Sequence, residues 1–299
     1  MTQPSWWHRF SVRGVFWRQL LRFAILNVPP WIEPIVMASW SLFFLMWGSA
    51  RRAVIRNLGV IKPGSFAIVN FFRCYRLFWN YAWTIADNVR FKEARTIPDW
   101  EFTGWKFFQE MQERDGGAIL LTAHMGSYDL GAHLFAETSS RRIVMVRAPE
   151  ADPETRAFEQ DRAAEGLRIE FNTRSTDLAI DLLDVIREGN IVAIQGDRVT
   201  GEIGFLPATV FGKPTRVPAG PFALALAARV PIFPVFVVRL GRRRYRLMTA
   251  RPIELVRSRD RDDDFRRAVE QWVEELEHVI RDCWSQWFTF EPYWPELAA

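Results

Sequence analysis

The stretch Ala118-Ile-Leu-Leu-Thr-Ala-His124-Met-Gly-Ser-Tyr-Asp129 contains both the pattern that decides the fold and polar residues suited to chemistry. Its first part, residues 118–123, is a short apolar run, which predicts a buried strand. A polar turn follows at once, and a helical pattern then continues through Phe135. A buried strand that leads through a turn into a helix is the repeating unit of α/β folds.

The same alternation continues toward the C-terminus. Short apolar runs predict further strands at residues 142–146, 191–194, 230–238 and 245–249. Helices are expected between them, from Ser175 or Thr176 to Gly189 and from Pro221 to Arg229. Residues 65–90 are apolar and aromatic without helix breakers, which predicts a long buried helix. We therefore expect an α/β domain with a mostly parallel central sheet flanked by helices.

Composition excludes several classes of protein. The chain has 299 residues, of which 49% are hydrophobic and 25% charged, values typical of a globular protein rather than of a disordered or multi-span membrane protein. Its two cysteines, Cys74 and Cys283, are too few for a disulfide framework or a cysteine-rich zinc site and fit a reducing compartment. No repeat or flexible linker divides the chain, so we expect one domain, residues 61–299, after an N-terminal segment, residues 1–60.

The N-terminal segment is basic and rich in tryptophan. Residues 1–60 contain seven arginines against one acid, Glu33, and six of the fourteen tryptophans of the chain. Indoles and arginines together are typical of an element that lies on a membrane surface, whereas nucleic acid is a weaker alternative. The uncharged residues 34–48 are shorter than the ~20 residues that span a bilayer, which favours an interfacial or half-inserted helix. The alternative is a pair of tryptophan-rich core helices.

His124 and Asp129 form the main candidate for catalysis. On a regular helix their side chains would point about 140° apart, so they meet only if the chain turns between them, as Gly126 and Ser127 allow. An Asp that accepts from one imidazole nitrogen leaves the other nitrogen to remove a proton from a hydroxyl. A structural histidine is the competing interpretation. A metal pair with His133 lacks the i, i+4 spacing of helical zinc motifs, so no metal site is predicted.

Several motifs in a fixed order carry a resemblance to a known family. They are His124-x4-Asp129, Gly196-Asp197-Arg198, Phe211-Gly-Lys-Pro214, Arg52-Ala-Val-Ile-Arg-Asn57-Leu58, Val146-Arg147-Ala-Pro149, Ala228-Arg-Val-Pro231 and a tryptophan-rich end at residues 284–294. Together they resemble the bacterial late lipid A acyltransferases (lauroyl and myristoyl transferase type), within the glycerolipid acyltransferase superfamily. The similarity covers most of the chain.

The resemblance implies an α/β acyltransferase domain and a membrane-associated O-acyltransferase without a metal or redox cofactor. Such an enzyme moves a fatty acyl group from an acyl carrier protein or coenzyme A thioester to a hydroxyl of a lipid acceptor. The acceptor stays open between a lipid A precursor, a lysophospholipid and a glycolipid. We expect a protein at the cytoplasmic face of a bacterial inner membrane, and no nucleic acid partner.

The resemblance also suggests roles for single residues. His124 is expected to be the general base, and Asp129 to orient it. Arg162 and Asp197 match family positions near the site. Arg198 and Arg147 are candidates for binding a phosphate of the donor or acceptor, because guanidinium groups suit phosphate geometry. The predicted substrate-binding set is therefore Arg147, Arg162, Asp197 and Arg198.

Two other mechanisms and one further surface stay open. Ser127 could act as an acyl-enzyme nucleophile, but no Gly-x-Ser-x-Gly elbow surrounds it. A non-enzymatic peripheral membrane protein that binds lipid on the same fold is the second alternative. The basic run from Arg239 to Arg246 is predicted to form a hairpin turn; it is either a simple exposed turn or a docking site for an acidic carrier protein or anionic headgroups.

Overall fold

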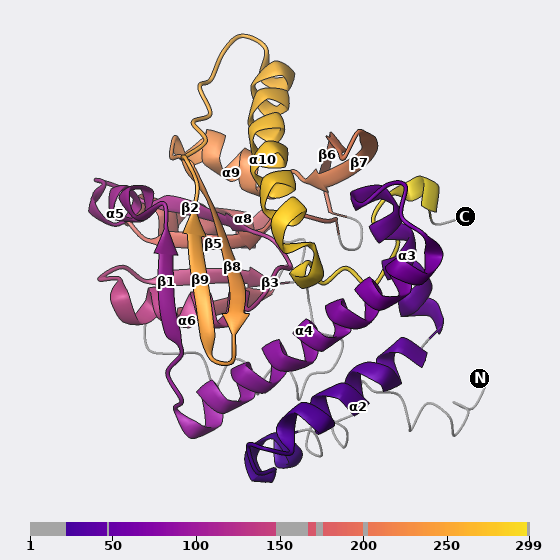
Figure 1. Cartoon of the computed structure of the whole chain (residues 1–299). Helices are drawn as coiled ribbons and strands as arrows, with labels where there is room; N and C mark the ends of the chain where they lie inside the picture. The colour runs from indigo at the N-terminus through magenta and orange to yellow at the C-terminus, as the bar shows by residue number, and fades with distance from the viewer. Residues whose placement is uncertain (1–21, 47, 148–166, 172–175, 200–202, 298–299) are drawn as a thin grey trace, which may run out of the picture.

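A seven-stranded sheet forms the centre of the computed structural model, which describes residues 22–46, 48–147, 167–171, 176–199 and 203–297 (Figure 1). The strands lie in the order β1-β9-β8-β2-β5-β3-β4, and only β8 and β9 pair antiparallel. Their bounds are β1 Asp99–Thr103, β2 Ala118–Thr122, β3 Ile143–Arg147, β4 Leu167–Phe171, β5 Ile191–Gln195, β8 Ile232–Gly241 and β9 Arg244–Thr249. The predicted mostly parallel α/β sheet is confirmed.

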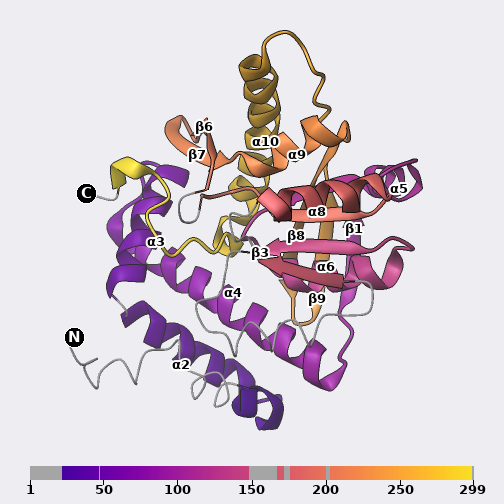
Figure 2. The ribbon, with the colours of Figure 1, turned by 180° about the vertical axis from the view of Figure 1, so that it is seen from behind.

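Helices cover both faces of this sheet. Because successive strand residues point to opposite faces, Ile119 and Leu121 of β2 pack in one core cluster, whereas Ala118 and Leu120 pack in another. The first cluster includes side chains of α8 (Thr176–Arg187), α9 (Gly220–Ala228) and α10 (Arg261–Cys283). The second includes side chains of α5 (Trp105–Glu113) and α6 (Tyr128–Thr138). The result is a three-layer arrangement, seen from behind in Figure 2.

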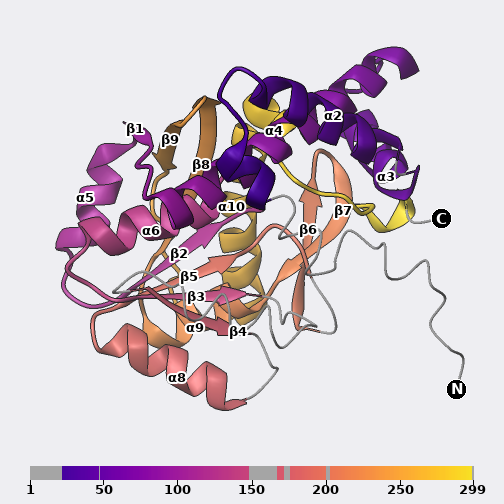
Figure 3. The same cartoon turned by 90° about the horizontal axis from the view of Figure 1, so that it is seen from below.

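Three N-terminal helices pack beside the sheet domain. They are α2 (Glu33–Met46), α3 (Gly48–Ile61) and α4 (Ala67–Ala94), and α2 lies alongside α4 (Figures 1 and 3). No helix among the described residues is long and apolar enough to cross a membrane. Of the range 34–48, expected to be helical, residues 34–46 fall in α2 and Gly48 begins α3, while residue 47 lies outside the described residues. Helix α4 is the predicted long helix. Its beginning is not buried, however, because Phe66, Ile68 and Phe72 are exposed.

A buried ionic network joins these helices to the sheet. Arg90 of α4 forms ion pairs with Glu33 of α2 and with Asp87 one turn earlier. Asp87 also accepts from Arg239 of β8 at 3.3 Å and from the hydroxyl of Tyr245 in β9 at 2.8 Å. Both carboxylates are buried, so their charges depend on these partners. The predicted boundary at residue 60, between an N-terminal segment and the acyltransferase-like domain, stays a prediction.

Some elements were not predicted. Edge strands β1 and β4 carry polar, partly exposed residues instead of a continuous apolar run. A separate hairpin, β6 (Phe205–Val210) and β7 (Lys213–Pro218), packs on α10. Beyond α10, a C-terminal segment (residues 284–297) contains the short 3-10 helices η2 (Trp284–Gln286) and η3 (Pro295–Leu297). This segment contributes to the candidate site.

Candidate active site

The pairing of two neighbouring parallel strands brings His124 and Asp197 together. Thr122 at the end of β2 pairs with Gln195 at the end of β5. His124 and Asp197 each lie two residues beyond this pair, so both project from the carboxyl edge of the sheet. Nδ1 of His124 lies 2.7 Å from Oδ1 of Asp197. Ligands of α/β proteins bind at this edge of the sheet.

The predicted turn after His124 is present and depends on Gly126. This residue has a φ of +51°, and a Cβ atom here would lie 1.9 Å from the carbonyl oxygen of Val237 in β8. Only glycine fits both conditions. Ser127 then forms the N-cap of α6, although its side chain does not cap the helix. The close approach to β8 fixes the path of the loop that carries His124.

Asp197 is fully buried and receives hydrogen bonds on both carboxylate oxygens. Oδ1 contacts His124, and Oδ2 accepts from Nε1 of Trp287 at 3.0 Å. Burial by itself would raise the pKa of this carboxyl, but His124, Arg198 and Trp287 together hold the pKa below its ordinary value. Asp197 is therefore a carboxylate that only accepts, which requires Nδ1 of His124 to carry the hydrogen. Nε2 is then left with a free lone pair.

The partner of His124 differs from the expectation. Asp129 was expected to orient the imidazole, but its carboxylate forms an ion pair with the guanidinium of Arg147 at the end of β3. Asp129 lies in the first turn of α6, whereas the pairing of β2 with β5 brings Asp197 level with His124. The contact between histidine and carboxylate thus joins residues 73 positions apart instead of five. A catalytic role for Asp129 stays a prediction.

The remaining predicted residues are placed as follows. Arg147 lies at the same edge of the sheet, where it pairs with Asp129. Arg198 follows Asp197 directly, and its buried Nε atom has no hydrogen-bond partner within the described part of the chain. Arg162 lies outside the described residues. Ser127, the alternative nucleophile, is buried and donates its hydroxyl to Oδ1 of Asn88 at 2.7 Å. Because its hydroxyl is held by Asn88, Ser127 is a poor candidate for a nucleophile that His124 would activate.

The C-terminal segment clamps the loop that carries His124. The backbone N–H of Phe288 donates to the carbonyl of His124 at 2.8 Å, and that of Gly126 donates to the carbonyl of Gln286 at 2.9 Å. Between them, Met125 and Trp287 form an antiparallel bridge. The sequence drew attention to this tryptophan-rich end but gave it no role. No sequence pattern near residue 287 indicates that Trp287 contacts Asp197, because this contact forms only in the tertiary structure.

Asn57 holds the C-terminal segment to α3. Its amide nitrogen donates to the carbonyl of Glu291 at 2.9 Å, and its side-chain oxygen accepts from the backbone N–H of Tyr293 at 3.0 Å. Trp294 adds a hydrogen bond from Nε1 to the carbonyl of Val210 in β6 at 3.0 Å. The Asn57-Leu58 motif therefore supports the candidate site from a distance.

Another histidine, His133, is not part of the contact between His124 and Asp197. His133 of α6 is buried against Phe91, and burial lowers the pKa of its imidazole to about 4, so the ring is neutral near pH 7. Among the described residues, no group of three or more His, Cys, Asp or Glu side chains lies close enough to hold a metal ion. The buried position of His133 is typical of a structural histidine.

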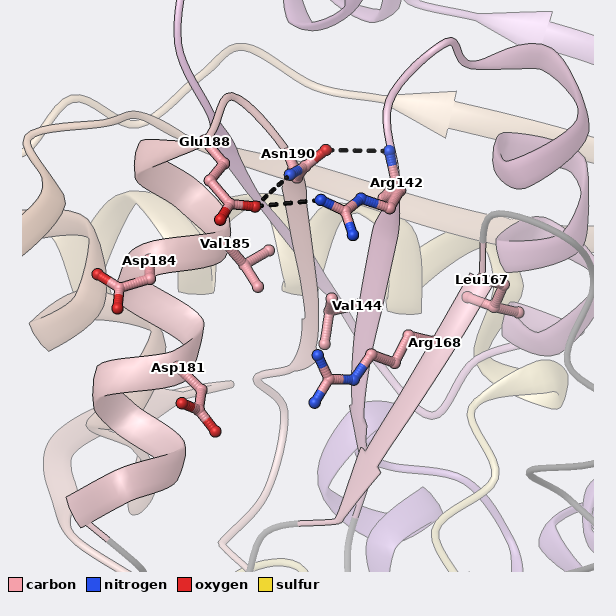
Figure 4. A pocket seen from close by; sticks show the side chains of 9 residues that line it. All are labelled: Arg142, Val144, Leu167, Arg168, Asp181, Asp184, Val185, Glu188 and Asn190. Atoms are coloured by element: carbon pink, nitrogen blue, oxygen red, sulfur yellow. Dashed lines mark hydrogen bonds and ion pairs between the residues drawn. The ribbon is translucent and has the colours of Figure 1, made fainter.

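A charged pocket lies near the beginning of β3 and β4, away from the carboxyl edge that carries His124. Figure 4 shows Arg142 and Arg168 on the strand side, Asp181 and Asp184 on α8, and Glu188 directly after that helix. Arg142 donates to Glu188 at 3.1 Å, so part of the charge is already paired. This pocket contains none of the candidate catalytic residues.

The predicted basic hairpin is present between β8 and β9, but most of its arginines have partners. Arg242 pairs with Glu33 at 2.8 Å, and Arg244 and Arg246 each lie 2.9 Å from a carboxylate oxygen of Glu101. These ion pairs reduce the charge available for a carrier protein. The hairpin turn is confirmed, and a docking role is left untested.

The match to a known family agrees with this geometry. Residues 75–296 match the model of the bacterial lipid A biosynthesis acyltransferases, and this range covers more than half of the chain. The chain belongs to this family. It is therefore an acyltransferase, as the sequence motifs indicated, with an acyl donor and a lipid acceptor as its substrates. No curated protein matches the sequence.

Proposed function

We propose that this lipid acyltransferase transfers a fatty acyl group from an acyl carrier protein or coenzyme A thioester to a hydroxyl of its lipid acceptor, with His124 as the general base. The contact between His124 and the buried carboxylate of Asp197 carries this proposal. It directs the free lone pair of Nε2 away from Asp197, and the side chain of His124 is 19% exposed, so a substrate hydroxyl can reach it. The acceptor is a lipid A precursor, a lysophospholipid or a glycolipid.

In this reaction His124 first accepts a proton from the acceptor hydroxyl and then gives a proton to the leaving thiolate. Nε2 of His124 removes the proton of the acceptor hydroxyl while its oxygen attacks the thioester carbonyl carbon. A carbon–oxygen bond forms, the carbon–sulfur bond breaks, and the proton passes from the imidazolium to the departing thiolate. Asp197 stabilises the imidazolium between these two transfers and keeps the ring in the required tautomer.

Arg198 is the proposed anchor for a phosphate on one of the substrates. It directly follows Asp197, whose pKa its charge helps to lower, and its unpartnered Nε leaves a buried donor available. Charge-assisted hydrogen bonds to phosphate are among the stronger polar contacts that proteins make. Arg147 is already paired with Asp129, so it is proposed to act on substrate only through that pair or by exchanging partners.

Membrane association is proposed to use α2 and the beginning of α4. Most large apolar side chains that stay exposed in the described residues lie between residues 22 and 72, and they are Phe23, Leu26, Trp31, Ile35, Leu42, Phe43, Met46, Phe66, Ile68, Val69, Phe71 and Phe72. An apolar surface of this kind is unusual on a soluble monomer. The 14 residues of α2 extend about 21 Å, less than the ~30 Å hydrocarbon core, so the helix is proposed to lie in the interface. The inner membrane, at its cytoplasmic face, is the proposed location.

The test is acyl transfer by purified protein in detergent. Labelled acyl carrier protein and acyl coenzyme A donors are offered with a panel of lipid acceptors, and wild type is compared with His124→Ala. We expect product from wild type and a loss of order 10²-fold or more in the variant, since that is the usual contribution of a general base. Equal transfer by both proteins would remove His124 from the mechanism. Lipid binding by both without transfer would favour the non-enzymatic alternative.

A further inference from the structure

The two oxygens of the Asp197 carboxylate have different partners on opposite sides. Oδ1 lies 2.7 Å from Nδ1 of His124, and Oδ2 lies 3.0 Å from Nε1 of Trp287. Asp197 and Trp287 are both buried, so water cannot replace either contact without opening the structure. The indole N–H is therefore part of what fixes the plane of the carboxylate.

Trp287 is attached to both ends of the contact that it supports. Its backbone bridges Met125, the residue that follows His124, and its ring lies against Tyr293 with centroids 4.7 Å apart. The neighbouring residues Gln286 and Phe288 bond to the backbone of Gly126 and His124. A single segment thus holds the loop of the histidine and, through one side chain, the carboxylate that the histidine contacts.

We propose that Trp287 is a positioning residue of the acyltransferase, whose indole N–H holds Asp197 in the orientation that His124 requires. This inference rests on the proposed function of His124. Trp287 does not touch the reacting atoms in this account. It acts on them through the carboxylate, in a chain that runs from indole to carboxylate to imidazole.

Removing the indole N–H should change the charge that faces His124. A hydrogen bond from Trp287 shares part of the negative charge of Asp197, so its loss leaves a buried carboxylate with less compensation. That carboxylate then stabilises the imidazolium more strongly than before. The base keeps its proton to higher pH, and the acid limb of the kcat/KM profile moves upward.

Other charged and titratable groups face the same place. Arg198 follows Asp197 beyond β5, Tyr128 of α6 has its ring centroid 6.0 Å from that of His124, and Tyr293 lies against Trp287. Burial comes first among the causes that raise the pKa of the Tyr128 and Tyr293 hydroxyls, so both stay neutral over the working pH range. The Asp129–Arg147 pair carries no net charge. None of these residues is itself replaced in a Trp287 variant.

The experiment compares Trp287→Phe with a matched control, Trp294→Phe. Both tryptophans are almost completely buried in the C-terminal segment, and both use Nε1 as a donor, but Trp294 donates to the carbonyl of Val210. We expect Trp287→Phe to lower kcat about 10-fold, the value of a hydrogen bond to a charged group, and to move the acid limb up by about half a pH unit or more. Trp294→Phe is expected to lose thermal stability similarly while its acid limb stays in place.

Two further measurements keep the test decisive. If Trp287→Phe folds poorly, benzothienylalanine at position 287 replaces the N–H by sulfur with almost the same shape. The downfield proton resonance of Nδ1–H, assigned by its loss in His124→Ala, reports the contact with Asp197 without any turnover. We expect it to shift in the Trp287 variants alone. A resonance and acid limb that are the same in Trp287→Phe and Trp294→Phe would overturn the inference. A shifted resonance in a protein without transfer activity would uphold the positioning contact and reject the proposed reaction.

Discussion

The carboxyl edge of the sheet buries a charged side chain, whereas the N-terminal helices expose apolar side chains. At the sheet edge, the charged carboxylate of Asp197 is withdrawn from water and given a partner for each oxygen. On α2 and at the beginning of α4, apolar side chains such as Ile35 and Phe66 are left in water without cover from the described residues. Burying a charge at the sheet edge and exposing apolar side chains on the helices both lower the stability of the fold.

This contrast indicates which side chains are placed for function rather than for stability. A protein shaped only for stability would bury Phe66 and leave Asp197 in water. The reversal at both places fits a reaction in which a base acts on a substrate that resides in a lipid layer. The ionic network of Glu33, Arg90, Asp87 and Arg239 connects the two regions, so they are not independent.

Arg90→Met should have the largest effect, because it breaks this connection. The change leaves the buried carboxylates of Glu33 and Asp87 without their shared cation, at an expected cost of about 3–5 kcal/mol in the free energy of unfolding. Denaturant unfolding measures this. Arg242→Met is the control, because Arg242 pairs with the same Glu33 but is 43% exposed, and it should cost about 1 kcal/mol or less. If both variants lost the same free energy of unfolding, the buried Arg90 would contribute no more to stability than the exposed Arg242.

A smaller effect is expected from the apolar surface. Phe66→Ser and Phe72→Ser each remove an exposed ring, so folding stability should change little, whereas binding to phosphatidylcholine vesicles that contain phosphatidylglycerol should fall about 10-fold for each. Vesicle co-sedimentation measures the binding. Val256→Ser removes an equally exposed apolar side chain from another part of the molecule and should leave binding unchanged. If all three variants bind like wild type, this surface has a different occupant.

The smallest effect concerns acid. Because the pKa of Asp197 lies below its ordinary value in the folded protein, its charge contributes stability above about pH 4, and this contribution is lost as pH falls further. The difference in free energy of unfolding between wild type and Asp197→Asn should therefore shrink below pH 4, by at most about 1.4 kcal/mol per pH unit. Urea unfolding across this range measures it. A difference that does not vary with pH would mean that the pKa of Asp197 is the same in the folded and the unfolded protein.

Sequence patterns predicted the sheet well where strands are buried on both faces. The predicted runs 118–123 and 191–194 are almost entirely apolar, and they correspond to β2 and β5. Edge strands β1 and β4 were not predicted, because half of their residues face water and the apolar signal is interrupted. The pattern at 65–90 gave the helix but not its exposed beginning, since exposure depends on what packs against it.

The sequence pointed to His124, Asp197 and Arg147, which lie at one edge of the sheet, but not to their contacts. His124, Asp197, Arg147 and the turn at Gly126 lie where the strand ends imply. The choice between Asp129 and Asp197 as the partner of His124 depends on which strand lies next to β2, and spacing along the chain cannot give that. Trp287 comes from the far end of the sequence, and only the bridge to Met125 brings it to the site.

The most direct measurement compares acyl transfer by Asp197→Asn and Asp129→Asn with that of wild type. An amide at position 197 can donate to Nδ1 and hold the proton on the wrong nitrogen, so the account predicts a loss of about 10³-fold or more in kcat, comparable with His124→Ala. Asp129→Asn should lose about 10-fold or less, because it disturbs only the pair with Arg147. A severe loss in Asp129→Asn beside near-normal transfer by Asp197→Asn would contradict the account.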